Sequence, residues 1–426
     1  MKKLFITMAI AVVSHVSFAQ NLENAKSLLV LHKFKQAREE LDKYTGTATP
    51  QFNMLKAAVY SGLANEAGTI GTPQAAELTT AAETAFAAYR QADPSMKLLD
   101  DAAYQYAPVN MYSFYYTAAY TDYAAKNWSS AFGKIKKAVE YSDLLIQKKL
   151  LNVALDTNVV VLAGIISENN GSANETVMYY KRLADFNIQG EGFESVYRYL
   201  VSYYFMKDNM PLFEKYKAAG GRAYPASEYF KFDKVEFAVG LQTNFNEKIK
   251  ALEKLLATDA GDYKANEVMG ELIYDELNPA DSTKQLPANA TELEKKMVVA
   301  FNKAAAAKTD FENPYLYLGD HFINKAVKLS YTRDKLMTAD AAKAAVAEKD
   351  YAAALFAAEE PYKKAAALFA ARTNLANKDK AQYKKAVSYL ADIASYKKVK
   401  AKGNAAEQKK WDDELLKWNG VYESIK

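Results

Sequence analysis

The chain has 426 residues, of which 55 are basic and 51 acidic; half are apolar, 31 are tyrosine, three are histidine and none is cysteine. The absence of cysteine excludes a disulfide-stabilised scaffold, a thiolate metal site, a cysteine nucleophile and a lipoprotein anchored through cysteine. The apolar content is high enough to bury a large core, which excludes a disordered chain.

Residues 1–19 have the layout of a secretory signal peptide. Two lysines precede an apolar run from Leu4 to Val13, and the segment ends in small residues before Gln20. The apolar run is shorter than the ~20 residues that cross a bilayer. We therefore expect cleavage after Ala19 and a periplasmic or secreted protein, without a lipobox cysteine and without stable membrane insertion once the signal is removed.

The charge of the expected mature chain is nearly balanced. The signal peptide holds two of the 55 basic residues and none of the 51 acidic ones, which leaves 53 basic residues and a net charge of +2. A nucleic-acid-binding chain usually carries a strongly basic patch or a high isoelectric point. The balance therefore predicts no nucleic-acid partner.

One helical pattern recurs along the rest of the chain. A small or apolar residue is followed four positions later by a large apolar residue, and three positions after that by another small or apolar residue. These spacings place each trio on one face of a helix. The trios are Ala37/Leu41/Tyr44, Ala85/Tyr89/Ala92, Ala131/Ile135/Ala138, Thr176/Tyr180/Leu183, Leu212/Tyr216/Ala219, Met297/Phe301/Ala304, Ala358/Tyr362/Ala365 and, at the end, Trp411/Leu415/Trp418.

A second helical pattern precedes several of these trios and has a very small residue at its centre. The clearest cases are Leu318-Gly319, in the segment that begins at Tyr315, and Ala163-Gly164. Glycine inside a helix is unfavourable unless a second helix must approach closely at that point. The pattern therefore predicts closely packed helix pairs.

The two patterns together resemble the tetratricopeptide repeat (TPR) family, whose unit is a pair of antiparallel helices. The step of 14 residues from Phe301 to Tyr315 matches the family's step from one unit to the next. The resemblance implies an all-α fold, a TPR-like α-solenoid of about eight or nine antiparallel helix pairs. Most intervals exceed the family's ~34 residues, so we expect irregular, extended repeats.

The longest polar connection suggests a boundary between two arrays. We expect an N-terminal TPR-like array over residues 20–277, a loop over residues 278–290, and a C-terminal array over residues 291–426 that ends in a capping helix. Within the loop, Asp281-Ser282-Thr283 resembles a short bacterial O-glycosylation sequon, although an ordinary polar loop has the same composition.

The sequence contains no recognisable catalytic or metal-binding motif. His32 and His321 lack carboxylates or histidines at ligand spacing, so we interpret them as structural helix histidines. Phosphate-binding glycine loops and the nucleophile elbow are absent from the sequence, and a lone S-x-x-K tetrad at Ser395 lacks its companion motifs. We expect no enzyme activity, no cofactor and no metal.

Tyrosines form the candidate binding site. In the TPR-like arrangement the first helix of each pair lines a concave groove, and the residues after each packing position face into it. A tyrosine ring can anchor a peptide or stack on a sugar, although it can equally fill a gap between units. The candidate groove residues are Tyr116, Tyr120, Tyr123, Tyr197, Tyr204 and Phe205.

These observations favour an exported, non-catalytic scaffold or adaptor that binds a protein or peptide partner in its groove. The alternative is a cell-envelope glycan-binding protein related to the TPR-containing starch-binding proteins. That family is normally anchored through a cysteine, which this chain lacks.

Overall fold

The structure is a computed structural model that describes residues 20–281, 284–337 and 339–426. Throughout these residues the regular secondary structure is helical, with no β-strand. The expected signal peptide and the residues Ser282 and Thr283 of the expected sequon lie outside the described residues. Over the part of the chain that is described, no helix combines the length and apolar character needed to cross a membrane.

The contacts between helices divide the chain into two units, one that ends at Lys231 and one that begins at Phe232. The expected boundary at residues 278–290 lies elsewhere in the structure: this segment connects two helices that pack as a pair inside the second unit. The polar composition of the segment therefore marks the connection between α13 (Tyr263–Leu277) and α14 (Ala290–Ala307).

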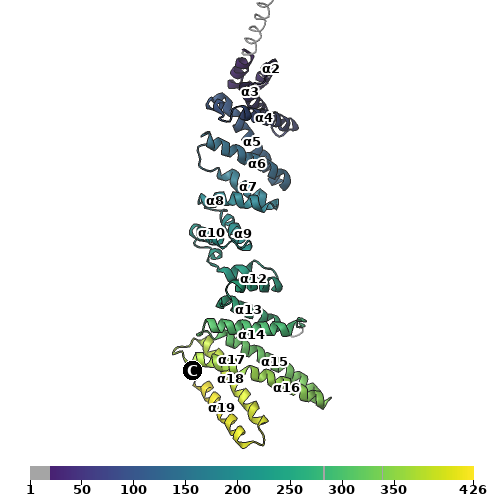
Figure 1. Cartoon of the computed structure of the whole chain (residues 1–426), viewed down its shortest axis with the longest axis vertical. Coiled ribbons are helices and arrows are strands. Elements are labelled where there is room, and N and C mark those ends of the chain that lie inside the picture. Colours follow the sequence, from purple (N-terminus) through teal and green to yellow (C-terminus); the bar gives the residue numbers. More distant parts are fainter. Residues whose placement is uncertain (1–19, 282–283, 338) are drawn as a thin grey trace, which may run out of the picture. The chain divides into compact units, whose positions relative to one another are not determined.

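The first unit is built from consecutive helices that pack as pairs (Figure 1). A helical segment over residues 20–30 is followed by α2 (Phe34–Asp42), α3 (Pro50–Ala64), α4 (Pro73–Ala92), α5 (Ala102–Ala124), α6 (Trp128–Gln147), α7 (Thr157–Asn169), α8 (Ala173–Asp185), α9 (Glu194–Met206) and α10 (Met210–Ala223). Helices α3 and α4, α5 and α6, α7 and α8, and α9 and α10 form the pairs. Short 3-10 helices at Lys97–Asp100 and Glu228–Lys231 lie in the connections.

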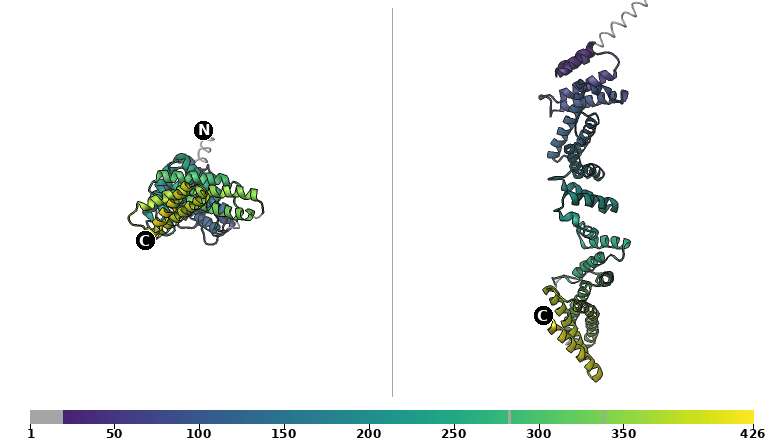
Figure 2. Two further views of the ribbon diagram at one scale, coloured as in Figure 1. Left: turned by 90° about the horizontal axis from the view of Figure 1, so that it is seen from below. Right: turned by 90° about the vertical axis from the view of Figure 1, so that its left-hand side faces the viewer.

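The second unit is also built from consecutive helices that pack as pairs (Figure 2). Its elements are α11 (Lys234–Gly240), α12 (Phe245–Thr258), α13 (Tyr263–Leu277), α14 (Ala290–Ala307), α15 (Asn313–Met337), α16 (Ala341–Ala357), α17 (Glu359–Ala370), α18 (Asn377–Lys400) and α19 (Ala405–Ser424). Helix α15 packs against both α16 and α17, and α18 packs against α19. The prediction of an all-α fold made of TPR-like helix pairs is confirmed.

The recurring trios form the packed faces of the second helices. Ile135 with its two alanines, Phe301 with Met297 and Ala304, and Tyr362 with its alanines are buried. Some trios depart in part from this pattern. Ala92 at the end of α4 is exposed, and in α10 the buried residues are Phe213, Tyr216 and Gly220, while the predicted Leu212 and Ala219 are half-buried. The buried face of α10 is therefore shifted by one residue from the predicted face.

The terminal helix α19 packs against α18, but only one residue of its predicted trio is fully buried. Trp418 is buried, Trp411 and Leu415 are half-buried, and Lys409 and Lys410 stay exposed. The helix therefore covers α18 with its apolar side and presents a polar side outward, as a capping helix does.

An unusually long interval between two trios has a simple structural cause. Helix α15 has 25 residues, and its partner is divided at Ala358 into α16 and α17. Helix α17 carries Tyr362 and covers one part of α15, while α16 packs along the rest. The additional residues thus lengthen one helix pair without forming an inserted loop.

The central glycines allow close contact with aromatic rings on the partner helix. A Cβ atom added to Gly319 would lie 2.5 Å from Cε1 of Tyr362, and one added to Gly164 would lie 2.2 Å from Cε1 of Tyr180. A Cβ atom added to Gly270 would lie 2.6 Å from Cε1 of Phe301. These distances are too short for a real side chain, so only glycine fits.

Hydrogen bonds hold two of these rings in place. Tyr362 donates through its hydroxyl to Asp320 at 2.6 Å, and Tyr180 donates to Glu168 at 2.7 Å. Burial and the neighbouring carboxylates raise the pKa of both tyrosines, so each remains a donor at neutral pH. The ring has little freedom to move away from the glycine.

Replacing Gly319 by alanine tests this packing rule. We expect Gly319→Ala to lower the free energy of unfolding by about 1–3 kcal/mol, because the new methyl group overlaps the fixed ring of Tyr362. Gly420→Ala in α19 is the control, since no atom lies within 4 Å of its added Cβ. The control should be neutral or stabilising by up to about 1 kcal/mol in urea denaturation. Equal effects of the two substitutions would contradict the rule.

Candidate functional site

Three of the candidate residues lie together on one face of α5. Tyr116, Tyr120 and Tyr123 follow one another at helical spacing, and Tyr120 and Tyr123 have ring centres 6.0 Å apart. Tyr112 extends the row at one end, stacked on Tyr116 at 6.0 Å, and Trp128 at the start of α6 extends it at the other, 5.9 Å from Tyr123. We call these five residues the aromatic stripe.

The stripe is fixed at one end and exposed at its middle. Tyr112 is half-buried and donates its hydroxyl hydrogen bond to Asp156 at 2.7 Å. Asp156 also accepts from Ser142 at 3.0 Å and caps the start of α7. In the middle of the row Tyr120 leaves 54% of its surface exposed, and Tyr123 and Trp128 at the other end are half-buried. The arrangement combines a rigid base with an accessible aromatic surface.

The other three candidates belong to the packed pair formed by α9 and α10. Tyr197 is only 1% exposed and donates to the backbone carbonyl of Ile188 at 2.9 Å. Tyr204 is buried and stacks on Tyr216 at 5.6 Å, while the half-buried Phe205 contacts Phe213 at 5.4 Å. Their rings fill the space between helices, so Tyr197 and Tyr204 have almost no surface to offer a ligand.

Two members of the stripe, Tyr112 and Trp128, are not among the candidate residues predicted from the sequence. Tyr112 lies four residues before Tyr116, so the helical spacing that selected the others also applied to it. Trp128 belongs to the next helix, and only the tight turn between α5 and α6 brings it beside Tyr123. A contact across a turn has no signal in the spacing along one helix.

The first unit also contains a large cavity of about 1310 Å³. Helical residues 20–30, the connection from α2 to α3 and the connection from α4 to α5 surround it. Its lining residues are Leu22, Glu23, Tyr44, Thr45, Gly46, Thr47, Thr49, Pro50, Gln51, Asp93, Lys97, Leu98, Asp100 and Asp101. Because connections form most of the wall, no helical periodicity indicated the cavity.

Some carboxylates of this cavity are engaged in local hydrogen bonds. Asp93 accepts from the hydroxyl of Ser95 at 2.5 Å and from the backbone amide of Lys97 at 2.9 Å, and these bonds lower its pKa. Asp101 pairs with Lys26 at 2.7 Å. The cavity thus presents ordered polar groups beside apolar side chains such as Leu22, a combination typical of ligand pockets.

The two histidines occupy different environments. His32 lies in a turn with a left-handed φ of 56°, not within a helix as expected, and contacts the hydroxyl of Tyr106 at 3.0 Å. His321 lies in α15 as expected and is 5% exposed. Its Nδ1 lies 3.0 Å from the side-chain amide of Asn278, and its Nε2 lies 3.3 Å from Glu294. Over the described ranges, no group of three or more histidine or acidic side chains is arranged to hold a metal ion.

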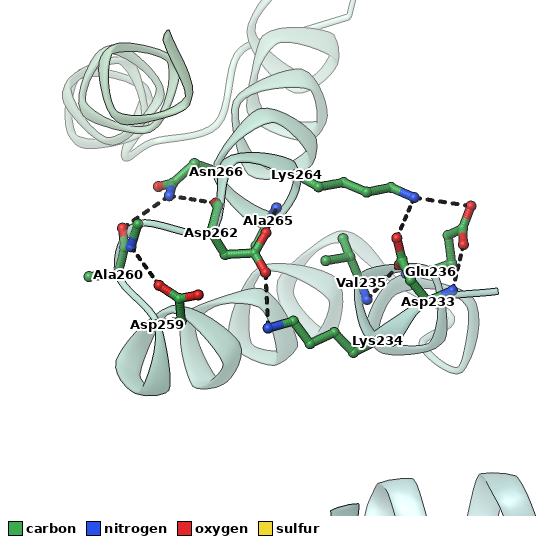
Figure 3. A network of polar contacts seen from close by, with 11 residues as sticks. Asp233, Lys234, Val235, Glu236, Asp259, Ala260, Asp262, Lys264, Ala265 and Asn266 are labelled. Atoms are coloured by element: carbon green, nitrogen blue, oxygen red, sulfur yellow. Dashed lines mark hydrogen bonds and ion pairs between the residues drawn. The ribbon is translucent and has the colours of Figure 1, made fainter. Parts of the chain in front are cut away.

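A polar network near the start of the second unit joins α11 to α13 (Figure 3). Lys264 pairs with Asp233 at 2.6 Å and with Glu236 at 3.3 Å, and Lys234 pairs with Asp262 at 3.0 Å. Asp233 also caps α11, and Asp262 caps α13. The charges therefore satisfy one another and the helix ends, which assigns the network a structural role.

Comparison with known proteins adds little. No protein-family model and no curated protein sequence matches the chain. Among solved structures, a match described as "Human IFIT1 dimer with m7Gppp-AAAA" has 14% sequence identity and covers 94% of this chain and 79% of that chain, with a TM-score of 0.18. At that identity and TM-score the match carries no information about a ligand or partner of this chain.

The contacts of Glu294 make a pH-dependent contribution to stability. His321 and the ion pair with Lys325 at 2.8 Å lower the pKa of Glu294 to about 2. A carboxyl whose pKa is depressed in the folded state stabilises the fold above its unfolded pKa of ~4.3, and this stabilisation is lost as the pH falls toward 2.

We expect Glu294→Gln to lower the free energy of unfolding by about 1–3 kcal/mol at pH 7, because it removes a charge that is paired in the folded state. In urea denaturation the difference from the unaltered protein should narrow steadily between pH 5 and pH 2. The exposed Glu292 on the same helix is the control, and Glu292→Gln should change stability by less than about 0.5 kcal/mol. A difference independent of pH would contradict this account.

Proposed function

We propose that the protein is an exported, non-catalytic scaffold or adaptor of the TPR type that binds a protein or peptide partner. The observation that carries the proposal is the aromatic stripe on α5. Its rings are held in a row by contacts with one another, while Tyr120 stays exposed in water. Exposed tyrosine and tryptophan clusters are typical of the energetic centres of protein interfaces.

The dimensions of the stripe suit an extended peptide. Tyr112 and Tyr123 are eleven residues apart on one helix, which corresponds to about 16 Å along its axis. An extended segment of about five residues covers the same length. An aromatic side chain has only two rotatable bonds, so it loses little conformational entropy when a partner binds. In the stripe the neighbouring rings already restrict these side chains, and a partner would therefore meet a largely preformed surface.

The expected signal peptide supports a partner outside the cytoplasm, in the periplasm or beyond the cell. The near-neutral charge gives no reason to propose a nucleic acid. The TPR resemblance supports accumulation of affinity over several helix pairs, because such arrays present a broad preformed surface. The exposed charged groups around the stripe would then adjust specificity and association rate.

The large cavity of the first unit supports glycan binding as the second candidate function. Carbohydrates are bound through hydroxyls, amides and carboxylates placed beside an aromatic ring, and the cavity brings together Thr47, Gln51, Asp100 and Tyr44. Its volume of about 1310 Å³ accommodates a small oligosaccharide. Micromolar binding on a glycan array, abolished by Gln51→Ala with Asp100→Ala, would favour this function over the adaptor.

Site-specific photo-crosslinking in the cells that produce the protein tests the adaptor function. With p-benzoylphenylalanine in place of Tyr120, we expect a discrete crosslinked product that contains a second polypeptide. Combining this with Tyr116→Ala and Tyr123→Ala should reduce the product about tenfold, since each truncation of an anchoring aromatic costs at least about 1 kcal/mol.

Phe186 is the matched control position. It is aromatic, lies in the same unit outside the stripe and is 51% exposed, close to the value for Tyr120. The same photo-reactive residue at position 186 should give no discrete product. A product of equal yield at both positions, or none at position 120, would argue against the stripe as a binding surface.

A further inference from the structure

A row of carboxylates on α13 in the second unit forms no ion pair among the described residues, although Lys308 and Lys264 lie close enough to Glu267 to lower its pKa in part. Glu267, Glu271 and Asp275 follow one another at four-residue intervals, about 6 Å apart along the helix axis. Within the described residues no lysine or arginine forms an ion pair with any of the three, whereas the adjacent Glu276 pairs with Lys284 at 3.1 Å. The row is therefore a local excess of negative charge.

The surroundings of this acidic row oppose its ionisation. Burial raises the pKa of Glu267, and the charge of Glu271 raises it further. Burial also raises the pKa of Glu271, with Asp275 adding to the effect. Like charges at this spacing destabilise a helix by about 0.2–0.5 kcal/mol per pair. The folded protein thus carries an electrostatic cost here that a bound cation would remove.

Residues of α15 connect the acidic row to a cavity. Glu267 is hydrogen-bonded to Asn313, and Glu271 to Tyr317. Tyr317 stacks on Phe301 at 5.3 Å, and burial together with Glu271 and Asp275 raises its pKa to about 12. The cavity is about 400 Å³ in volume and is lined by Phe311, Glu312, Asn313, Leu316, Tyr317, Asp320, Phe369, Lys378, Asp379, Gln382 and Lys385.

Most charges inside this cavity are already paired. Arg372 contacts Glu312 through both ends of its guanidinium group and lies 3.8 Å from Asp379, and Lys385 pairs with Asp320 at 2.7 Å. Lys378, at the exposed rim, has no ion pair with a described residue. Within the described residues, two lysines without ion pairs, Lys378 at the rim and Lys308 near Glu267, lie beside three carboxylates without ion pairs, which leaves a net negative surface.

The cavity also contains an unsatisfied acceptor. Gln382 lines the wall from α18, and its Oε1 is buried without a hydrogen-bond partner among the described residues. A buried carbonyl oxygen without a donor costs about 1–3 kcal/mol. A ligand group that donates hydrogen bonds would recover this cost, and one that is also cationic would match the acidic row.

We propose that the row and the cavity together bind an extended segment of another protein that carries lysine or arginine at alternate positions. Alternate residues of an extended chain lie about 6.6–6.8 Å apart on one side, close to the ~6 Å spacing of the carboxylates. One basic side chain enters the cavity toward Gln382, and its neighbours pair with Glu267, Glu271 and Asp275. This surface is separate from the aromatic stripe, and the proposal holds whether or not the stripe binds a partner.

Calorimetric titration of the mature full-length protein with a blocked peptide of alternating lysine and alanine tests the proposal. We expect binding that weakens with added salt. The triple variant Glu267→Gln, Glu271→Gln, Asp275→Asn should bind at least about tenfold more weakly. The variant Asp350→Asn, Asp413→Asn, Glu423→Gln is the control, because it removes the same charge from exposed positions of the same unit without ion pairs.

The following results would support or overturn the proposal. Equal weakening in the control variant would show a non-specific response to net charge and overturn the proposal, as would the absence of binding. A glutamate–alanine peptide should not bind. Spermidine, which carries similarly spaced ammonium groups on a shorter chain, should bind more weakly than the peptide, and equal affinity would overturn a polypeptide as the occupant.

A variant that binds the peptide more tightly than the unaltered protein cannot be explained by misfolding. Lys378→Gln removes the unpaired cation at the rim and should strengthen peptide binding about two- to fivefold. Lys380→Gln, on the same helix but not lining the cavity, should leave binding unchanged. Thermal unfolding should show the acidic triple variant to be at least as stable as the unaltered protein, because like-charge repulsion is relieved. An unchanged affinity for Lys378→Gln would count against the site.

Discussion

The contact between a glycine on one helix and an aromatic ring on its partner governs how the helix pairs of this protein are built. Gly164 with Tyr180, Gly270 with Phe301 and Gly319 with Tyr362 repeat the same arrangement in different pairs. The missing side chain lets the backbones approach, and the ring then fills the space with a large apolar surface. Other packed positions need only be small, which explains the many buried alanines around the rings.

The tyrosine content follows from the same contact. A phenylalanine ring would fill the space equally well, but a tyrosine also reaches a carboxylate on the partner helix, as Tyr180 and Tyr362 do. Each such bond satisfies a buried hydroxyl and fixes the pair in register. The protein achieves this without disulfides, since its sequence contains no cysteine. Most tyrosine rings with such bonds are therefore structural, whereas the stripe on α5 arranges its rings in a row that leaves Tyr120 exposed.

Helical spacing predicted the fold well because each second helix must bury the same face. The trio around Phe301 and the glycine at Gly319 were recognisable for that reason.

The candidate site could be predicted less completely from the sequence. Tyr116, Tyr120 and Tyr123 share a face of α5, but Tyr197 and Tyr204 are covered by α10, and nothing in their own helix indicates that cover. The first cavity is lined mostly by connections between helices, and the second by residues of α15, α17 and α18, so the lining residues are far apart in the sequence. Glu267, Glu271 and Asp275 have the spacing of an ordinary solvated face, and only their missing partners distinguish them.

The division of one second helix at Ala358 has a consequence for how such a chain can change in length. Helix α17 keeps the ring of Tyr362 against Gly319, while α16 and the far part of α15 form an extension that contacts the next pair through Glu348, which bonds to Tyr396 and Lys400 of α18. Residues added at this end leave the register of the array untouched. The length of this extension can therefore change independently of the rest of the chain. The extension can acquire a new surface while the contact between Gly319 and Tyr362 is retained.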